Sequence, residues 1–347
     1  MKNQIKHRIL PFMVFLFLIN QSIVLAQKVT DPKYAFIQNE RLGRGINILS
    51  ADPIWRDPLK ARMNSDHFRL IKEAGFGNVR IAINPFGFAL NQTDFTIDPT
   101  FFIALDWAIQ QALNNKLMAI IDFHAHIAMQ EKPLKKKAMF LAMWKQIGDR
   151  YKGFPSDVLF EICNEPNMDP AIWNEIHSEA YAILRKSNPS RTLLLGTING
   201  NQILHLKDLI LPENDKNIIV AIHYYSPIQF THQGAPWSKK NKDLSGISWT
   251  NTKSAEEVIK KDFDLADAWS KKNMLPITLG EFGAYEKAEE SSRIRWTDYV
   301  ARQAEARNWS WSYWQFDSDF IVYDINKEEW VLPILGALIP KQYKPSR

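Results

Sequence analysis

The sequence predicts an α/β fold, a single (β/α)8 TIM barrel, because strand-like and helix-like segments alternate and because eight strands can be counted. Short apolar or β-branched runs recur between amphipathic helical patterns, which is typical of βα units around a parallel sheet. The runs that we interpret as strands are residues 45–48, 78–83, 118–123, 158–162, 192–196, 218–223, 277–281 and 310–315. Consecutive units in this number fit a closed barrel, in which chemistry takes place at the carboxyl ends of the strands.

Helical patterns separate most of these strands, and the crossover after the fifth strand, near residues 203–209, is short. The predicted helices are residues 65–74, 102–114, 134–152, 171–187, 255–272 and 291–307. An open doubly wound sheet is the alternative, but it usually carries a Gly-rich phosphate turn after its first strand. Gly43 and Gly45 stand at the front of the first strand instead, so this fingerprint is missing.

The N-terminus has the pattern of an export signal. A basic lead is followed by an apolar run over residues 9–19, and Val24, Leu25 and Ala26 offer a cleavage site with a small residue. The run is shorter than the roughly 20 apolar residues of a transmembrane helix. We therefore expect a signal peptide at 1–26, a catalytic domain at 27–347 and a secreted or periplasmic protein, with an uncleaved anchor as the alternative.

Net charge argues against a nucleic-acid partner, and the cysteine count argues against a disulfide. Removing Lys2, Lys6 and Arg8 with the leader lowers the formal net charge of +5 by three, and no dense basic stretch accompanies a nucleic-acid motif. We expect no nucleic-acid partner, no membrane contact after signal cleavage, and a monomer. Cys163 is the single cysteine of the chain, so no internal disulfide can form.

Polar and ionisable residues gather where the predicted strands end. A barrel that served only stability would have no reason to end strands four and seven in carboxylates, because burying unpaired charge is costly. These strand-end residues are Arg80, Asp122, His124, Asn164, Glu165, His223, Tyr225, Glu281 and Trp314. Their joint occurrence at one mouth of the barrel predicts an active site.

Two facing carboxylates are the minimum equipment for glycoside cleavage, since one protonates the leaving oxygen and the other attacks or activates water. From strand spacing and barrel radius we expect the carboxyl groups of Glu165 and Glu281 to lie about 7 Å apart. That distance straddles the retaining and the inverting separations, so this estimate leaves the stereochemical outcome open.

The spaced motifs resemble the family 5 glycoside hydrolases, from about Gly43 to Ile339 and in the family's order. The motifs are Val79-Arg80, Asp122-Phe123-His124, Ile162-Cys163-Asn164-Glu165-Pro166, His223-Tyr224-Tyr225, Gly280-Glu281-Phe282-Gly283 and Tyr313-Trp314. The resemblance implies a retaining enzyme with Glu165 as acid/base and Glu281 as nucleophile.

The remaining positions take their roles from the same resemblance. Asn164 would bind the sugar 2-hydroxyl, Arg80 would keep the nucleophile ionised and in place, and Tyr225 would donate to the same carboxylate. The resemblance places two histidines and an aromatic platform at the cleaved subsite, namely His124, His223 and Trp314. No cofactor and no metal is expected.

Several alternatives stay open at this stage. The resemblance favours an endo-acting enzyme on β-1,4-glucan, with a β-mannanase or another β-glucanase next, and a polysaccharide or oligosaccharide as the partner. His124 and His126 also resemble the paired histidines of barrel metallohydrolases, although those pairs stand on the first strand rather than the third. A barrel that binds sugar without cutting it would keep its aromatic residues but lose Glu165 or Glu281, and both are present.

Overall fold

The computed structural model describes residues 33–340, and the predicted signal peptide lies outside them. Eight parallel strands form a closed barrel in sequence order, so the predicted (β/α)8 fold is confirmed. The strands are β1 (Arg44–Ile48), β2 (Asn78–Ile83), β3 (Met118–Phe123), β4 (Val158–Glu161), β5 (Leu193–Gly196), β6 (Ile218–Tyr224), β7 (Ile277–Phe282) and β8 (Ser310–Tyr313).

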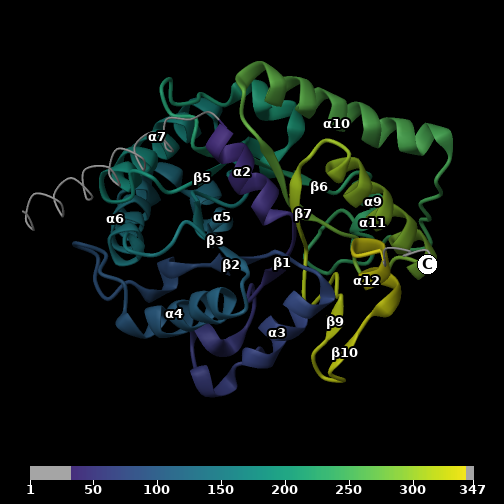
Figure 1. Cartoon of the computed structure of the whole chain (residues 1–347), viewed down its shortest axis with the longest axis horizontal. Helices are drawn as coiled ribbons and strands as arrows, with labels where there is room; N and C mark the ends of the chain where they lie inside the picture. Colours follow the sequence, from purple (N-terminus) through teal and green to yellow (C-terminus); the bar gives the residue numbers. More distant parts are fainter. Residues whose placement is uncertain (1–32, 341–347) are drawn as a thin grey trace, which may run out of the picture.

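Helices surround this barrel as a ring (Figure 1). All six predicted helical segments are present, as α3 (Ser65–Ala74), α4 (Pro99–Asn114), α6 (Pro133–Tyr151), α7 (Pro170–Ser187), α10 (Lys253–Asn273) and α11 (Glu290–Glu305). The short fifth crossover is a 3-10 segment, Ile203–Asp208. Elements without a sequence prediction are α2 (Lys33–Leu42), α5 (His126–Glu131), α8 (Ile198–Asn201), α9 (Ile228–Thr231), α12 (Leu332–Leu338) and the hairpin β9 (Tyr323–Asp324) with β10 (Glu329–Trp330).

Local capping explains where several of these helices begin. The Asp98 side chain accepts from the Thr100 amide and Pro99 is the first residue of α4, so that helix starts three residues earlier than apolar periodicity indicates. The same Asp-Pro arrangement starts α7. Asn64 forms a capping box at α3, and Gly75 ends that helix with a left-handed φ of 109°.

The N-terminal end of the barrel is closed by α2. Ala35 and Leu42 of this helix join an apolar cluster with inward-facing residues of β3 to β6. The barrel members of this cluster are Met118, Ile120, Leu159, Leu194 and Ile219. Asn39 of α2 accepts from the Ser310 hydroxyl of β8 at 2.7 Å, so the helix is tied to both sides of the barrel. Chemistry is thereby left to the opposite end.

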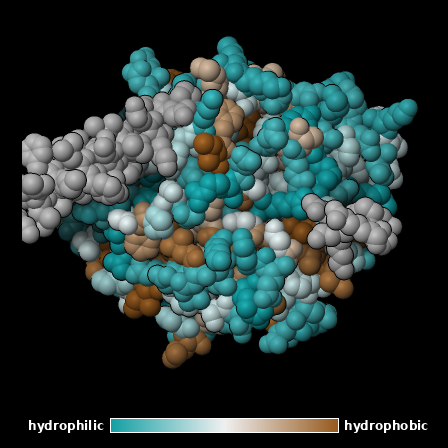
Figure 2. All heavy atoms as spheres, viewed as in Figure 1, coloured by the Kyte–Doolittle hydropathy of each residue, from teal (hydrophilic) through white to brown (hydrophobic). Residues whose placement is uncertain are grey.

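The outer surface mixes hydrophilic and apolar residues (Figure 2). An apolar patch is visible over α2, where Phe36 and Ile37 are 43% and 50% exposed. Within residues 33–340, no helix combines the length and the apolar character needed to cross a bilayer.

Candidate active site

Glu165 and Glu281 face each other at the carboxyl end of the barrel. One carboxylate oxygen of each, together with a ring nitrogen of His223, lies within 4.8 Å of the others. These oxygens approach more closely than the distance of about 7 Å that ideal barrel geometry predicts between the two carboxyl groups. An approach of the two oxygens within 4.8 Å suits the retaining class of glycosidase, whose carboxyl groups lie about 5–5.5 Å apart, better than the inverting class.

The two carboxylates have different surroundings. Glu281 is 5% exposed, and it accepts from Arg80 Nη1 at 2.8 Å and from Tyr225 Oη at 2.9 Å. The side chain of Glu165 is 26% exposed, and its Oε1 lies 2.8 Å from His223 Nδ1. Burial raises the pKa of Glu281, while the positive charge of Arg80 acts in the opposite direction. Arg80 therefore limits, but does not cancel, the effect of burial on this carboxyl group.

Arg80 lies at the centre of a buried acidic cluster. Its Nε and Nη2 atoms donate to both oxygens of Glu161 at 2.6 and 2.9 Å, and Nη2 lies 3.2 Å from Asp122. It also donates to Asn47 Oδ1 and Asn164 Oδ1, each at 2.8 Å. Sequence reasoning missed Asn47, which lies inside β1, and Glu161, which is the last residue of β4 but lies inside the strand predicted over residues 158–162.

Asp122, His124 and Trp314 form one side of the site. Burial raises the pKa of Asp122 to about 7, and its Oδ2 lies 2.7 Å from His124 Nδ1. The His124 ring stacks on Trp314 with centroids 5.3 Å apart and planes 13° from parallel. Asn164 Nδ2 lies 3.3 Å from the other ring nitrogen of His124. Asn164, His124 and Trp314 are thus held as one surface beside the two glutamates.

A third residue that the sequence did not single out lies behind His223. Asn201, in the turn after β5, is fully buried, and its Nδ2 lies 3.2 Å from His223 Nε2. Little in the sequence favoured the selection of this residue, because Asn199-Gly200-Asn201 is a pattern typical of an ordinary polar loop. The site therefore unites all the predicted residues and adds Asn47, Glu161 and Asn201.

Two hollows flank the carboxylate pair. One of about 440 Å³ is lined by Glu165, His223, Tyr225, His232 and residues of the 3-10 segment after α8. Another of about 380 Å³ lies beyond His124 and is lined by residues of the loops after β1 and β2. The second set includes Ser50, Asp52, Trp55, Asn84 and Phe88. Together they extend the site in two directions from the glutamates.

Metal-ligating side chains converge in a single place within the described residues, and the group is Glu165, His223 and Glu281. His124 is not a member of this group, and its Nδ1 faces Asp122. The two carboxylates of the group are the side chains that a retaining glycosidase requires.

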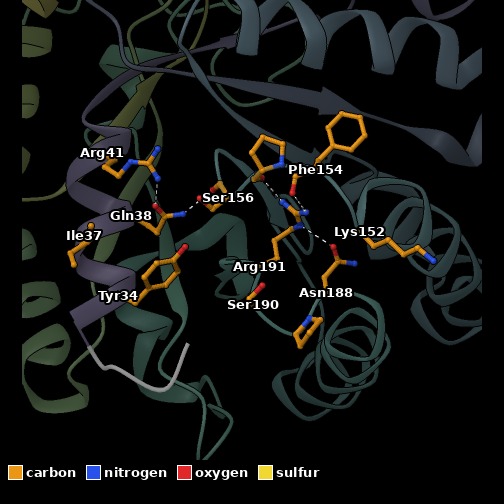
Figure 3. Close-up of a pocket in the computed structure, with 12 residues that line it drawn as sticks. Tyr34, Ile37, Gln38, Arg41, Lys152, Phe154, Ser156, Asn188, Ser190 and Arg191 are labelled. Atoms are coloured by element: carbon orange, nitrogen blue, oxygen red, sulfur yellow. Dashed lines mark hydrogen bonds between the residues drawn. The ribbon is translucent and has the colours of Figure 1, made fainter. Parts of the chain in front are cut away.

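Another hollow, of about 610 Å³, lies at the other end of the barrel between α2 and the start of β5 (Figure 3). Arg191 lines it, but its guanidinium donates to Asn188 Oδ1 and to the carbonyls of Tyr151, Phe154, Pro155 and Val158. Arg41 in the same hollow pairs with Asp157 and Gln38. Because Arg191 and Arg41 already have hydrogen-bond partners within the protein, we interpret their role in this hollow as structural.

Comparisons with known proteins agree with this arrangement. Residues 43–319 match the family model described as cellulase (glycosyl hydrolase family 5). Endoglucanase H of Acetivibrio thermocellus is 28% identical over 92% of this chain, and endoglucanase B of Clostridium cellulovorans is 25% identical over 79%. The chain spans 35% and 64% of the lengths of these two relatives.

Solved structures extend the match to the whole barrel. Thermotoga maritima Cel5A superposes with a TM-score of 0.83 at 40% identity, covering 88% of this chain and 100% of that one. The cellulose synthase subunit Z of Clostridioides difficile superposes with a TM-score of 0.81 at 38% identity, covering 86% and 99%. The extent of the family match and these identities show that the chain belongs to the cellulase family, glycosyl hydrolase family 5.

Proposed function

We propose that this protein is a retaining, endo-acting glycoside hydrolase that cleaves β-1,4-glucan. The observation that carries the proposal is the pair of carboxylates within 4.8 Å, of which one binds Arg80 and Tyr225 and the other binds His223. This asymmetry suits a nucleophile that must be ionised and an acid that must carry a proton.

The chemistry takes two steps. First, the proton on Glu165 moves to the glycosidic oxygen as its bond to the anomeric carbon breaks, and an oxygen of Glu281 forms an ester bond to that carbon. Then ionised Glu165 takes a proton from water, the water oxygen bonds to the anomeric carbon, and the ester bond to Glu281 breaks. Both carboxyl groups return to their starting states.

The hollows on the two sides of the glutamates support endo action, because a chain bound across both would be cut internally. The relatives named endoglucanase support glucan as the substrate. Thermotoga maritima Cel5A has been solved in complex with cellobiose and with mannotriose, so β-mannan is the second candidate. We also propose that the protein is exported, since the N-terminal pattern of a signal peptide supports this location.

The test is hydrolysis of soluble carboxymethyl cellulose, lichenan, glucomannan, galactomannan and xylan by the purified protein, with Glu281→Gln and Glu165→Gln as matched variants. We expect the highest rate on a glucan, a rapid fall in viscosity, and a loss of about 10³-fold or more in both variants. Proton NMR of the first products should show the β-anomer. Prolonged treatment with a chelator should leave the rate unchanged.

Inverted first products would contradict the retaining assignment. A loss with chelator that zinc restores would favour a metallohydrolase instead. Full activity of Glu281→Gln would remove the proposed nucleophile.

A further inference from the structure

The turn after β5 has an unusual backbone conformation and packs against Glu165, the proposed acid/base. In α8 (Ile198–Asn201) three successive residues, Asn199, Gly200 and Asn201, have left-handed φ angles of 55°, 75° and 55°. A non-Gly residue in this region costs about 1 kcal/mol, and asparagine tolerates it best. An ideal Cβ on Gly200 would lie 3.7 Å from the Glu165 carboxyl group, so the strained turn packs directly on that side chain.

The same turn delivers the Asn201 side chain to His223. Nδ2 of Asn201 lies 3.2 Å from His223 Nε2, and neither side chain is more than 1% exposed. Oδ1 of Asn201 has no hydrogen-bond partner among the described residues. An ideal Cβ on Gly196 would lie only 2.3 Å from this Oδ1 atom, so a side chain at position 196 would collide with it. The fold thus leaves one amide oxygen unsatisfied and reserves a glycine in order to keep this amide in place.

The other nitrogen of His223 faces both catalytic carboxylates. Nδ1 lies 2.8 Å from Glu165 Oε1 and 3.5 Å from Glu281 Oε2. Burial lowers the pKa of His223 to about 4, so the ring is neutral near pH 7 and carries one N–H. Two carboxylates favour this proton on Nδ1, which makes Nε2 an acceptor and the Asn201 amide its donor.

The tautomer decides which way the acid points. If Nδ1 carries the proton, it donates to Oε1 of Glu165, and the acid proton of Glu165 is left on Oε2 for the glycosidic oxygen. If Nε2 carries the proton, Nδ1 becomes an acceptor that binds the acid proton itself. The second arrangement withholds the proton from the bond that must break.

We propose that Asn201 is a positioning residue, whose amide donates to Nε2 of His223 and so holds the tautomer that directs the Glu165 proton toward the leaving group. This inference rests on the proposed function for its kinetic consequence, whereas the tautomer itself can be measured without turnover.

The experiment compares Asn201→Asp and Asn201→Gly with the wild type. Aspartate keeps the shape but offers acceptors, so it should bind Nε2–H and reverse the tautomer. Glycine removes the side chain and keeps the left-handed backbone without strain. Asn308→Gly is the control, because Asn308 is exposed, has a φ of 57° and lies after α11 at the opposite end of the barrel.

The first readout is the imidazole ¹⁵N shift of His223, assigned by its absence in His223→Gln. We expect Nδ1–H in the wild type and in Asn308→Gly, and Nε2–H or imidazolium in Asn201→Asp. An Nδ1–H ring in Asn201→Asp would overturn the proposal, whether or not the protein is a glycosidase.

The second readout is kcat/KM on two β-cellobiosides. Phenyl cellobioside needs a proton on its leaving oxygen, whereas dinitrophenyl cellobioside does not. Both Asn201 variants should lose about ten-fold or more on the phenyl substrate, which is part of the roughly 10²- to 10⁴-fold contribution of general acid catalysis, and about two-fold or less on the dinitrophenyl substrate. Equal losses on both would assign Asn201 a purely structural role. A wild type inactive on both cellobiosides and on the matching mannobiosides would instead contradict the proposed function.

Discussion

Arg80 is shared among carboxylates rather than devoted to the proposed nucleophile. Its two-point contact goes to Glu161, with a single hydrogen bond to Glu281 and a longer contact to Asp122. Glu161 therefore fixes the guanidinium plane, and the remaining N–H groups are presented to Glu281, Asn47 and Asn164. The arginine reduces the net negative charge of the whole cluster and positions the nucleophile at the same time.

This sharing predicts opposite effects of two substitutions on the pH–rate profile. Arg80→Ala removes a positive charge that lowers the pKa of Glu281, so that pKa should rise further. The acidic limb of kcat/KM, which requires the ionised nucleophile, should then move to higher pH. Glu161→Gln leaves Arg80 in place with one negative charge fewer, so its acidic limb should stay or move to lower pH.

Melting temperatures separate electrostatic from structural effects in these variants. Arg80→Ala leaves buried Glu161 and Asp122 without their cation and should cost about 3–5 kcal/mol of stability. If the melting temperature falls and the acidic limb does not move, Arg80 only holds the barrel together.

The residues that sequence reasoning found are those with a motif. The strand-end carboxylates and the flanking aromatic and imidazole groups could be located because polar residues interrupt apolar strands. Glu161 could not be separated from an ordinary strand residue, since only its distance of 2.6 Å to Arg80 reveals its partner. Asn201 depends on a backbone turn that no local pattern specifies.

At the scale of elements, an irregularity between β6 and β7 places the histidine beside the nucleophile. Ile222 pairs with Leu279, and the next residue, His223, pairs with Glu281, so Gly280 is an extra residue in β7. Such bulges redirect side chains next to active sites. An ideal Cβ on Gly280 would lie 3.1 Å from His223 Nε2, which is closer than most Cβ contacts. Glycine here lets the imidazole lie against the strand.

Gly280→Ala should therefore impair catalysis without unfolding the barrel. The added methyl group must displace the His223 ring by a few tenths of an ångström, and we expect a loss of about ten-fold in kcat, because misplacement by about 1 Å can cost 100-fold. Gly336→Ala is the matched control, since nothing lies within 4 Å of its Cβ position in α12. The control should keep its rate and gain about 0.5–1 kcal/mol of stability. Equal rates of the two variants would show that the close approach has no catalytic role.

The order and type of the barrel elements were predictable, because alternation of short apolar runs and amphipathic segments depends on local spacing. The residues at which the elements begin and end were less predictable. Strand β8 ends at Tyr313 rather than at residue 315, and β6 extends to Tyr224. The helix α2 had no sequence prediction, since its exposed Phe36 and Ile37 weaken the amphipathic pattern by which a helix is recognised.

At the scale of the whole molecule, stability and chemistry occupy opposite ends of the barrel. The apolar cluster under α2 and the hydrogen bonds of Arg191 lie at the N-terminal end. The opposite end collects carboxylates and imidazoles in surroundings that disfavour their charged forms. At this end burial lowers the pKa values of His223 and His232 to about 4 and raises that of Asp122 to about 7. Burial likewise lowers the pKa of His177, which lies in α7, to about 4. Folding is thus coupled to proton binding, mainly through histidines.

The sign of this coupling predicts loss of stability in mild acid. Between pH 6.5 and pH 4 the unfolded chain binds protons on these three histidines and the folded protein does not, so the free energy of unfolding falls as the pH falls. Burial also lowers the pKa values of His67 and His124, which act with the three histidines, and it raises those of five carboxyl groups, which act in the opposite direction, namely Asp122, Glu281, Asp298, Asp317 and Asp319. Among these carboxyl groups only Asp122 has a shift as large as those of the three histidines. We expect the melting temperature to drop by a few degrees from pH 7 to pH 4.5, since 1 kcal/mol shifts it by about 2 °C or less in a chain of this size.

His177 tests this coupling away from the catalytic groups, because it lies in α7 against Trp173 and hydrogen-bonds Asn174 at 2.9 Å. His177→Gln removes one titrating group and keeps a side chain that can hydrogen-bond, so its melting temperature should fall less between pH 7 and pH 4.5 than that of the wild type. Its kcat/KM should remain unchanged at both pH values. Differential scanning calorimetry across this range measures the slopes directly. Parallel slopes for the variant and the wild type would show that His177 takes up no proton on unfolding and that the acid sensitivity has another source.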